Sequence, residues 1–164
     1  MGEASGILGR IEAIVGSAGL LTGDDVAARP AAWLRRTPMR GRAIVRPAST
    51  AELAAVMAAC NAAGQNVVPL GGNTGLVDGT LSTDDDVLLS LERMTKIESI
   101  DTQAGTMTVE AGAPLQAVQE AAAGEGMMFT LDLGARGSAT IGRNIATNAG
   151  GNAVIRYGMM REQV

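Results

Sequence analysis

Residues 43 to 70 constrain the fold of this 164-residue chain more than any other stretch. Ala43–Arg46 and Asn66–Leu70 are short runs rich in Val, Ile and Leu, as in buried strands. Between them, Ser49 and Glu52 have the spacing of a capping box, which starts a helix, and Gly64 is typical of a helix end. The order strand, helix, strand predicts a βαβ unit and a mixed α and β fold.

The helix between these strands has one apolar stripe. Leu53, Val56, Met57 and Cys60 recur at helical spacing and are predicted to face the core. Cys60 is therefore interpreted as a small buried residue rather than a nucleophile.

Shorter elements follow. Asp86–Ser90 is predicted as a buried strand, and Lys96–Asp101 and Thr106–Ala111 flank a four-residue turn, as in a hairpin. Pro114 is predicted to open a second helix that ends at Gly124. Its inward residues would be Leu115, Val118 and Ala122.

The start of the chain carries a further apolar stretch. Ile7–Leu21 contains Arg10 and Glu12 among apolar residues, which predicts a short amphipathic helix rather than a secretory signal.

Composition excludes several classes of function. A net charge of −4 argues against nucleic acid or an anionic membrane as the main partner, and no apolar run reaches the length of a membrane span. The chain has no histidine, so it cannot hold a Ser-His-Asp triad, a Cys-His pair or a histidine-ligated metal. The single cysteine, Cys60, cannot form an internal disulfide and leaves the compartment open, with a reducing cytoplasm as the default.

The first candidate site is the segment Leu70-Gly-Gly-Asn-Thr-Gly-Leu76, directly after a predicted strand. Its glycines would let consecutive backbone amides turn inward and form a nest for an anion such as a pyrophosphate. The alternative is a sharp turn between two strands, and the segment alone leaves both open.

The second candidate site is the segment from Gly134 to Gly151, which is rich in Gly, Ser, Thr and Asn and shows no helical period. It offers many neutral hydrogen-bonding groups but no acid, base or nucleophile pair, so it suits binding of a large polar cofactor better than proton transfer. The alternative is a long surface loop.

The two segments together resemble a known family. Val68-Pro-Leu-Gly-Gly-Asn-Thr-Gly75, the run Leu131–Gly151 and the following Arg156-Tyr-Gly158 are similar to FAD-linked oxidases of the p-cresol methylhydroxylase/vanillyl-alcohol oxidase type. Within it, the chain is most similar to D-2-hydroxyacid dehydrogenases: D-2-hydroxyglutarate and D-lactate dehydrogenases and the flavin subunit of glycolate oxidase. The resemblance runs from about Trp33 to the last residue.

The resemblance implies an α+β fold with a PCMH-type FAD-binding domain of two α/β subdomains and the flavin between them. Residues 1–37 would be a helical segment, and residues 38–164 an FAD-binding domain whose second subdomain is incomplete. A C-terminal substrate domain with the catalytic groups would be absent, so the chain would be an N-terminal fragment. No catalytic and no metal residue is therefore assigned.

The loop Gly71–Leu76 would hold the pyrophosphate, and the second segment would line the other side of the cofactor. The residues implied are Leu70, Gly71, Gly72, Asn73, Thr74, Gly75, Leu76, Ser138, Thr140, Ile141, Gly142, Asn144, Thr147, Asn148, Ala149 and Gly150.

Two positions bear on how FAD would be held. Thr74 stands where some relatives carry the histidine that tethers the flavin, so the FAD is expected to be noncovalent. Arg143 stands where most relatives have glycine. A left-handed backbone there would cost roughly 1–2 kcal/mol.

The implied function is oxidation of a D-2-hydroxyacid to the 2-oxoacid, with hydride transfer to FAD. The isolated chain is expected to bind FAD weakly or not at all, because its second glycine-rich segment would lack the strands that hold it in place. It is also expected to be inactive, since a small hydroxyacid would bind through the missing domain. Two alternatives stay open: a flavin-binding or structural module without turnover, and a reductase like the UDP-N-acetylenolpyruvoylglucosamine enzyme. Nothing in the sequence decides the oligomeric state, and a homodimer is among the options.

Overall fold

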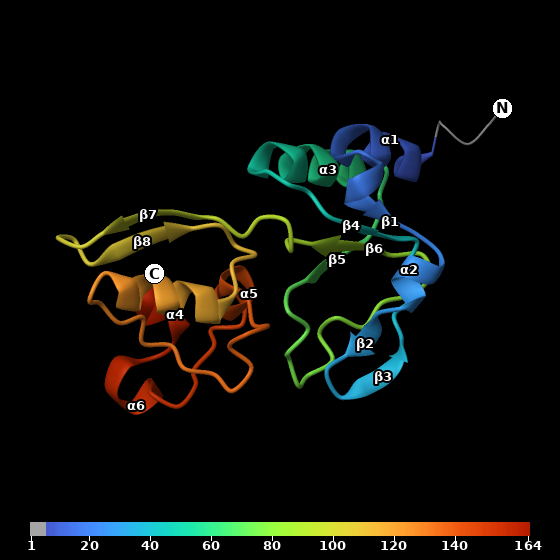
Figure 1. The fold of residues 1–164 in the computed structure, drawn as a ribbon. Helices are drawn as coiled ribbons and strands as arrows, with labels where there is room; N and C mark the ends of the chain where they lie inside the picture. The colour runs from blue at the N-terminus through green and yellow to red at the C-terminus, as the bar shows by residue number, and fades with distance from the viewer. Residues whose placement is uncertain (1–5) are drawn as a thin grey trace. The chain divides into compact units, whose positions relative to one another are not determined.

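The computed structural model describes residues 6–164, which form two compact units. Unit 1 ends at Arg93, and unit 2 runs from Met94 to Val164 (Figure 1). Within the described residues, no helix is both long enough and apolar enough to cross a membrane.

Unit 1 is built on a four-stranded sheet in the order β1, β4, β6, β5. Its strands are β1 (Leu20–Leu21), β4 (Ala43–Val45), β5 (Val67–Leu70) and β6 (Val87–Ser90). β4 and β5 both run parallel to β6, and β1 pairs antiparallel with β4. The predicted βαβ unit is confirmed, with β6 inserted between its two strands.

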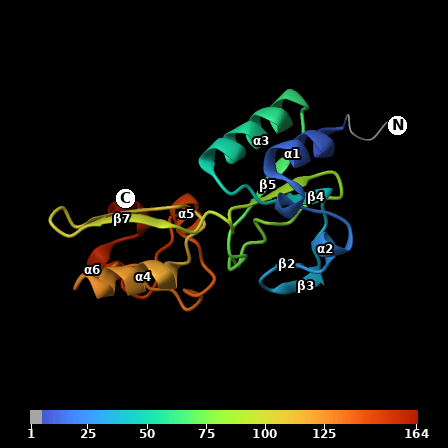
Figure 2. The same ribbon diagram turned by 45° about the horizontal axis from the view of Figure 1, so that its top comes forward.

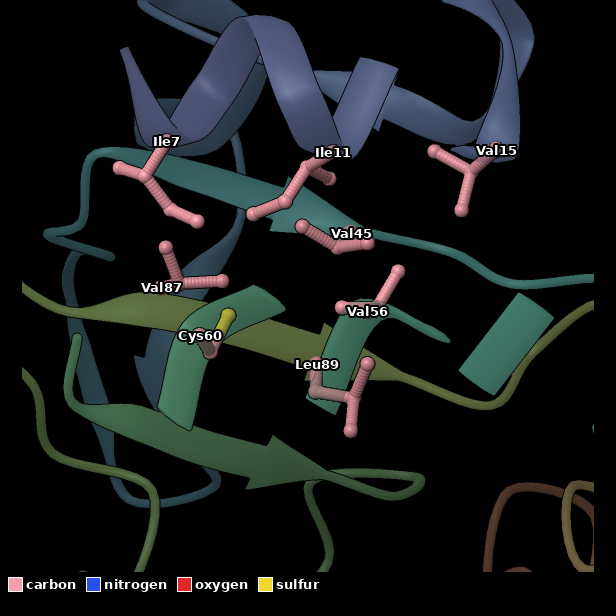
Figure 3. Packing of buried hydrophobic residues seen from close by; sticks show 8 residues of the cluster. All are labelled: Ile7, Ile11, Val15, Val45, Val56, Cys60, Val87 and Leu89. Carbon is pink, nitrogen blue, oxygen red and sulfur yellow. The ribbon is translucent and has the colours of Figure 1, made fainter. Parts of the chain in front are cut away.

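Two helices cover one face of this sheet. α1 (Ile7–Val15) and α3 (Thr50–Ala62) lie side by side over it (Figures 1 and 2). Side chains alternate between the two faces of a strand, so alternate residues of β4 and β6 point to these helices. Figure 3 shows the resulting cluster, formed by Ile7, Ile11, Val15, Val45, Val56, Cys60, Val87 and Leu89.

The opposite face of the sheet is covered by the segment that joins β1 to β4. Ile44 and Leu88 point to this side and are fully buried. They pack with Val26 of α2 (Asp24–Ala27) and with Met39. Burial on both faces explains the continuous apolar runs of β4 and β6.

The start of α3 matches the predicted capping box, with one shift. The Ser49 hydroxyl accepts from the Glu52 N–H at 3.2 Å, while the Glu52 carboxylate accepts from the N–H of Ala48 at 2.8 Å rather than from that of Ser49. Cys60 is buried as predicted, whereas Met57 is 42% exposed. Met57 follows the inward-facing Val56, and one helical step turns a side chain by about 100°.

The N-terminal segment is less helical than predicted. α1 ends at Val15 because Gly16 adopts a φ of +71°, and Leu20 and Leu21 form β1 instead of continuing a helix to residue 21. Residues 30–38 form an antiparallel hairpin of β2 (Pro30–Ala32) and β3 (Arg35–Pro38). Residues 6–37 therefore contain strands as well as helices.

β5 forms one edge of the sheet and contains a proline. The carbonyl of Asn66 accepts from the Val87 N–H at 3.0 Å, so residue 66 and its alternate neighbours Val68 and Leu70 direct their backbone groups to β6. Successive residues of a strand direct their backbone groups to opposite sides, so Pro69 directs its backbone nitrogen away from β6. A proline is compatible with a strand at such a position.

Unit 2 combines a hairpin with short helices. β7 (Ile97–Asp101) and β8 (Thr106–Val109) pair antiparallel, and α4 (Leu115–Gly124) follows Pro114, as predicted. Leu115, Val118 and Ala122 are its buried residues, also as predicted. Gly124 is the last residue of the helix, and the left-handed glycine is Gly126, with φ +71°.

Part of the segment expected to lack helix is helical. α5 (Ile141–Ala146) lies within it, and α6 (Val154–Tyr157) follows it. α5 is too short to show a helical period, and tertiary hydrogen bonds hold its start. The N–H of Ile141 donates to the Ala113 carbonyl at 3.0 Å, and that of Gly142 donates to the Ala111 carbonyl at 2.8 Å.

Candidate functional site

The first glycine-rich loop leaves the carboxyl end of β5. Because β4, β5 and β6 are parallel, their carboxyl ends meet at one edge of the sheet, where ligands bind in open α/β sheets. Within residues 6–164, none of the N–H groups of residues 71–76 donates to a protein acceptor. Such a run of free amides is suited to the oxygens of a phosphate group.

The side chains of this loop are arranged unequally. Leu70 is buried, Gly71–Thr74 are half-buried, and Gly75 and Leu76 are exposed. A Cβ added at Gly75 would meet no atom within 4 Å, so its backbone borders open space. Asn73 points its side chain into unit 1, where its Nδ2 donates to the Pro30 carbonyl at 3.0 Å. Its backbone N–H, rather than its side-chain amide, remains available to a ligand.

An ion cluster that the sequence analysis missed lies at the same edge of the sheet. Glu92, just after β6, accepts two hydrogen bonds from Arg29, at 2.7 and 2.9 Å, and one from Arg46, at 3.1 Å. The Ser90 hydroxyl adds a fourth at 3.0 Å. Chiefly because Arg29 donates to it, the pKa of Glu92 is lowered from 4.5 to about 2.

Arg46 in this cluster is incompletely satisfied. Its Nη2 donates to the Ala18 carbonyl at 2.5 Å, but its Nε is buried without a partner among the described residues. Both Arg46 and Arg29 are engaged by Glu92, so the cluster carries one excess positive charge beside the strand ends.

In unit 2, Asn144 on α5 is the predicted site residue whose side-chain donor most needs a hydrogen-bond acceptor from a ligand. It is 4% exposed, and its Nδ2 has no partner within the described part of the chain. A buried amide without a partner costs about 1–3 kcal/mol, so a ligand oxygen that accepted from it would be favoured.

Other predicted residues of the second segment serve the unit itself. Ile141 belongs to its hydrophobic core, and Ala149 packs against that core. The Thr147 hydroxyl donates to the Arg143 carbonyl at 2.9 Å. Asn148 has a φ of +48°, and its Oδ1 accepts from the Arg161 N–H at 3.0 Å.

The remaining predicted residues differ in exposure. Ser138 is exposed, and Thr140, Gly142 and Gly150 are half-buried. A Cβ at Gly142 would lie 2.7 Å from the Ala111 Cβ, so close packing of α5 within unit 2 is sufficient to require glycine there. The two glycine-rich segments lie in different units.

Arg143 lies in the first turns of α5, with an ordinary helical backbone. The left-handed conformation considered for it from the sequence is not adopted, and the positive-φ residues of this segment are Asn148 and Gly151. No backbone strain is therefore attributed to Arg143.

Unit 2 also contains an open cavity of about 450 Å³. Its lining is largely apolar and includes Met107, Val109, Phe129, Ile145 and Met160. Of the predicted cofactor residues, only Ile141 borders it. An apolar surface of this kind offers little to a pyrophosphate or a ribose.

The donor set of the two segments consists of neutral N–H groups, which suits a cofactor with an anionic pyrophosphate. Among residues 6–164, no group of three or more Cys, Asp or Glu side chains is placed to hold a metal ion. The residues present therefore fit the FAD that the sequence resemblance implies.

Comparison with known proteins supports this assignment. The family described as FAD binding domain matches residues 41–164. A D-2-hydroxyglutarate dehydrogenase of Xanthomonas citri pv. viticola is 47% identical over 132 residues, which are 80% of this chain and 28% of that protein. A mitochondrial D-2-hydroxyglutarate dehydrogenase of Bos taurus is 39% identical over 80% of this chain and 24% of that protein. The chain thus spans about a quarter of the length of these curated relatives.

The cattle relative is named as mitochondrial, so the comparison gives no support to the cytoplasmic location predicted from the sequence.

Solved structures share the fold at low sequence identity. An alkyldihydroxyacetonephosphate synthase aligns with a TM-score of 0.84 at 16% identity, over 95% of this chain and 31% of that one. A p-cresol methylhydroxylase with substrate bound aligns with a TM-score of 0.69 at 17% identity, over 88% of this chain and 29% of that one. With 124 consecutive residues (41 to 164) matched and relatives this similar, the chain belongs to the FAD binding domain family and has the PCMH-type fold.

Proposed function

We propose that this chain is the FAD-binding part of a flavoprotein dehydrogenase that oxidises a D-2-hydroxyacid to the 2-oxoacid. The family supports FAD as the cofactor, and the names of the relatives support the substrate class. When bound, FAD supplies the acceptor for the hydride that leaves C2 of the hydroxyacid.

The observation that carries the proposal is the run of free amides in residues 71–76 at the carboxyl edge of the parallel sheet. These amides would bind the pyrophosphate without any charged side chain. Asn144 would donate its buried Nδ2 to a polar atom of the cofactor, because that group has no other acceptor within the described residues.

The FAD is proposed to be noncovalent. The chain contains no histidine that could bond to the flavin. Its one cysteine, Cys60, is 1% exposed in the core of unit 1 and cannot reach a flavin. Thr74 is a weak nucleophile at neutral pH. Acid precipitation of the loaded protein should therefore leave all flavin absorbance in the supernatant, and flavin that stays with the precipitated chain would refute this point.

A matched pair of variants at Gly75 tests the loop assignment. The backbone there leaves room for a side chain, so both Gly75→Asp and Gly75→Asn should fold. Asp would place a negative charge beside the pyrophosphate, whereas Asn has nearly the same shape without the charge. FAD binding should weaken more than about tenfold in the Asp variant relative to the Asn variant, equivalent to ~1.4 kcal/mol.

The test uses a chimera in which residues 41–164 replace the aligned segment of the Xanthomonas citri pv. viticola dehydrogenase. The FAD affinity of the apo-chimera is measured by flavin fluorescence, and turnover is followed with D-2-hydroxyglutarate and a dye acceptor. Equal affinities for the two variants would reject the loop as the pyrophosphate site. A folded chimera that bound no FAD would reject the proposed function.

A further inference from the structure

We propose that the β2–β3 hairpin holds the loop of residues 71–76 in its ligand-binding shape, with Asn73 and Thr80 as positioning residues. The inference rests on the proposed function, because the shape is useful only if the loop binds the FAD pyrophosphate. It adds a role for residues 30–38, which precede the segment matched by the family, residues 41–164.

Asn73 anchors the middle of the loop. It has a φ of +53°, a conformation that L-residues other than Asn and Asp rarely adopt. Its Nδ2 donates to the Pro30 carbonyl of β2 at 3.0 Å, and its Oδ1 lies 2.8 Å from the Thr80 hydroxyl. Both polar atoms of the side-chain amide are therefore bonded within unit 1. They hold the backbone of the loop in its turn and do not face the ligand.

Thr80 connects the far end of the loop to the same strand. It is 6% exposed, and its hydroxyl lies 3.0 Å from the Ala31 carbonyl and 2.8 Å from the Asn73 Oδ1. The hydroxyl has one proton and donates to one of these oxygens at a time. Because Thr80 and Ala31 are buried, removal of the hydroxyl leaves the Ala31 carbonyl short of a donor, and it also removes the donor to the half-buried Asn73 Oδ1.

A third contact joins the hairpin to the loop at the surface. Arg35 of β3 donates to the Asp78 carboxylate at 2.6 and 2.8 Å, and Asp78 also has a φ of +53°. This pair is largely exposed, and exposed ion pairs contribute little. The positioning role is therefore assigned to Thr80, which is buried, and to Asn73, which is half-buried.

The anchors matter because the loop has no backbone hydrogen bonds of its own. The N–H groups of residues 71–76 find no acceptor among residues 6–164, so nothing in the loop backbone fixes their directions. A loop that is ordered only on binding loses affinity to the entropy of ordering, whereas one held beforehand does not.

The first experiment uses the 164-residue chain without FAD. NMR relaxation gives the order parameters of the amides of residues 71–76 in the natural chain and in Thr80→Val, Thr80→Ser and Asn73→Gly. The natural chain and Thr80→Ser should give values of about 0.85, and Thr80→Val and Asn73→Gly should fall below about 0.6. Asn73→Gly keeps the positive φ without strain and removes both side-chain anchors. Glycine also frees the backbone by itself, so a loop that stays ordered in this variant counts strongly against the anchors even if Thr80→Val fails to fold.

The matched control is Thr22→Val. Thr22 is an exposed threonine of unit 1 whose hydroxyl makes no hydrogen bond to a described residue. The Thr22→Val variant should therefore leave the order parameters of residues 71–76 unchanged. In a second Xanthomonas chimera that takes residues 30–164 from this chain, so that it includes the β2–β3 hairpin, Thr80→Val should weaken FAD binding about tenfold, and Thr80→Ser should restore it. If the loop stays ordered in Thr80→Val and Asn73→Gly, the inference is wrong. If the order parameters change as expected but the natural chimera binds no FAD, the proposed function fails and the anchoring stands.

Discussion

Glu92→Gln tests the ion cluster at the carboxyl edge of the sheet. Glu92 accepts two hydrogen bonds from Arg29 and one each from Arg46 and Ser90. Gln keeps the size of the side chain but removes its charge and replaces one accepting oxygen by a donor. The guanidinium groups of Arg29 and Arg46 would then lie close together without a carboxylate between them.

The magnitude follows from the pKa of Glu92. The value of about 2 in the folded chain, against 4.5 ordinarily, corresponds to roughly 3 kcal/mol before screening. The side chain is 36% exposed, so solvent reduces the expected loss in Glu92→Gln to about 1–2 kcal/mol. Because the folded pKa is depressed, this stabilisation is fully present above about pH 5 and is lost as the pH falls through 2.

The assay is urea unfolding of the natural chain and of Glu92→Gln between pH 2 and pH 7, followed by fluorescence. Trp33 is the only tryptophan, so its signal reports on unit 1. Glu12→Gln, which removes a charge from an exposed residue of α1, is the control and should change stability by less than about 0.5 kcal/mol. The difference between Glu92→Gln and the natural chain should shrink steadily below pH 5. A difference that was absent at pH 7, or equally large at pH 2, would refute the reasoning.

Three further outcomes are expected. Ser49→Ala removes the N-cap acceptor of α3 and should lower the free energy of unfolding of unit 1 by about 1 kcal/mol, with Ser49→Asp as the conservative comparison in the same urea titration. Gly151→Ala would place a Cβ 2.1 Å from the Asp132 carbonyl oxygen at a φ of +99°, and hydrogen exchange should report a destabilisation of unit 2 by more than about 2 kcal/mol. Cys60 should react with an aromatic disulfide reagent only as fast as unit 1 unfolds, because burial covers the thiol and raises its pKa; immediate stoichiometric reaction would contradict its place in the core.

The elements that the sequence predicted are those with a complete local signal. The capping box of Ser49 and Glu52 and the proline before α4 identify helix starts within a few residues of chain. β1 and the β2–β3 hairpin were missed because they are two to four residues long and have too few positions to show alternation. α5 was missed because its first N–H groups donate to the carbonyls of Ala111 and Ala113, which lie about thirty residues earlier in the chain.

The candidate site was predicted only in part, for a related reason. The glycine pattern identifies the loop of residues 71–76, but nothing in it shows that Asn73 turns its side chain away from the ligand toward Pro30. The cluster of Glu92 is equally invisible, since Arg29 lies 63 residues before it. Contacts over such separations depend on the fold and leave no periodic trace in a single sequence.

The two edge strands of the sheet in unit 1, β1 and β5, bear on how the protein avoids aggregation. An exposed strand border is a template on which a neighbouring chain can add a strand. At the β5 border, Pro69 offers no N–H at the position where an incoming strand would need one, and at the other border β1 is only two residues long. Pro69 lies one residue before the first glycine-rich segment, which begins at Leu70. Ligand binding and protection against aggregation thus depend on the same short stretch of chain.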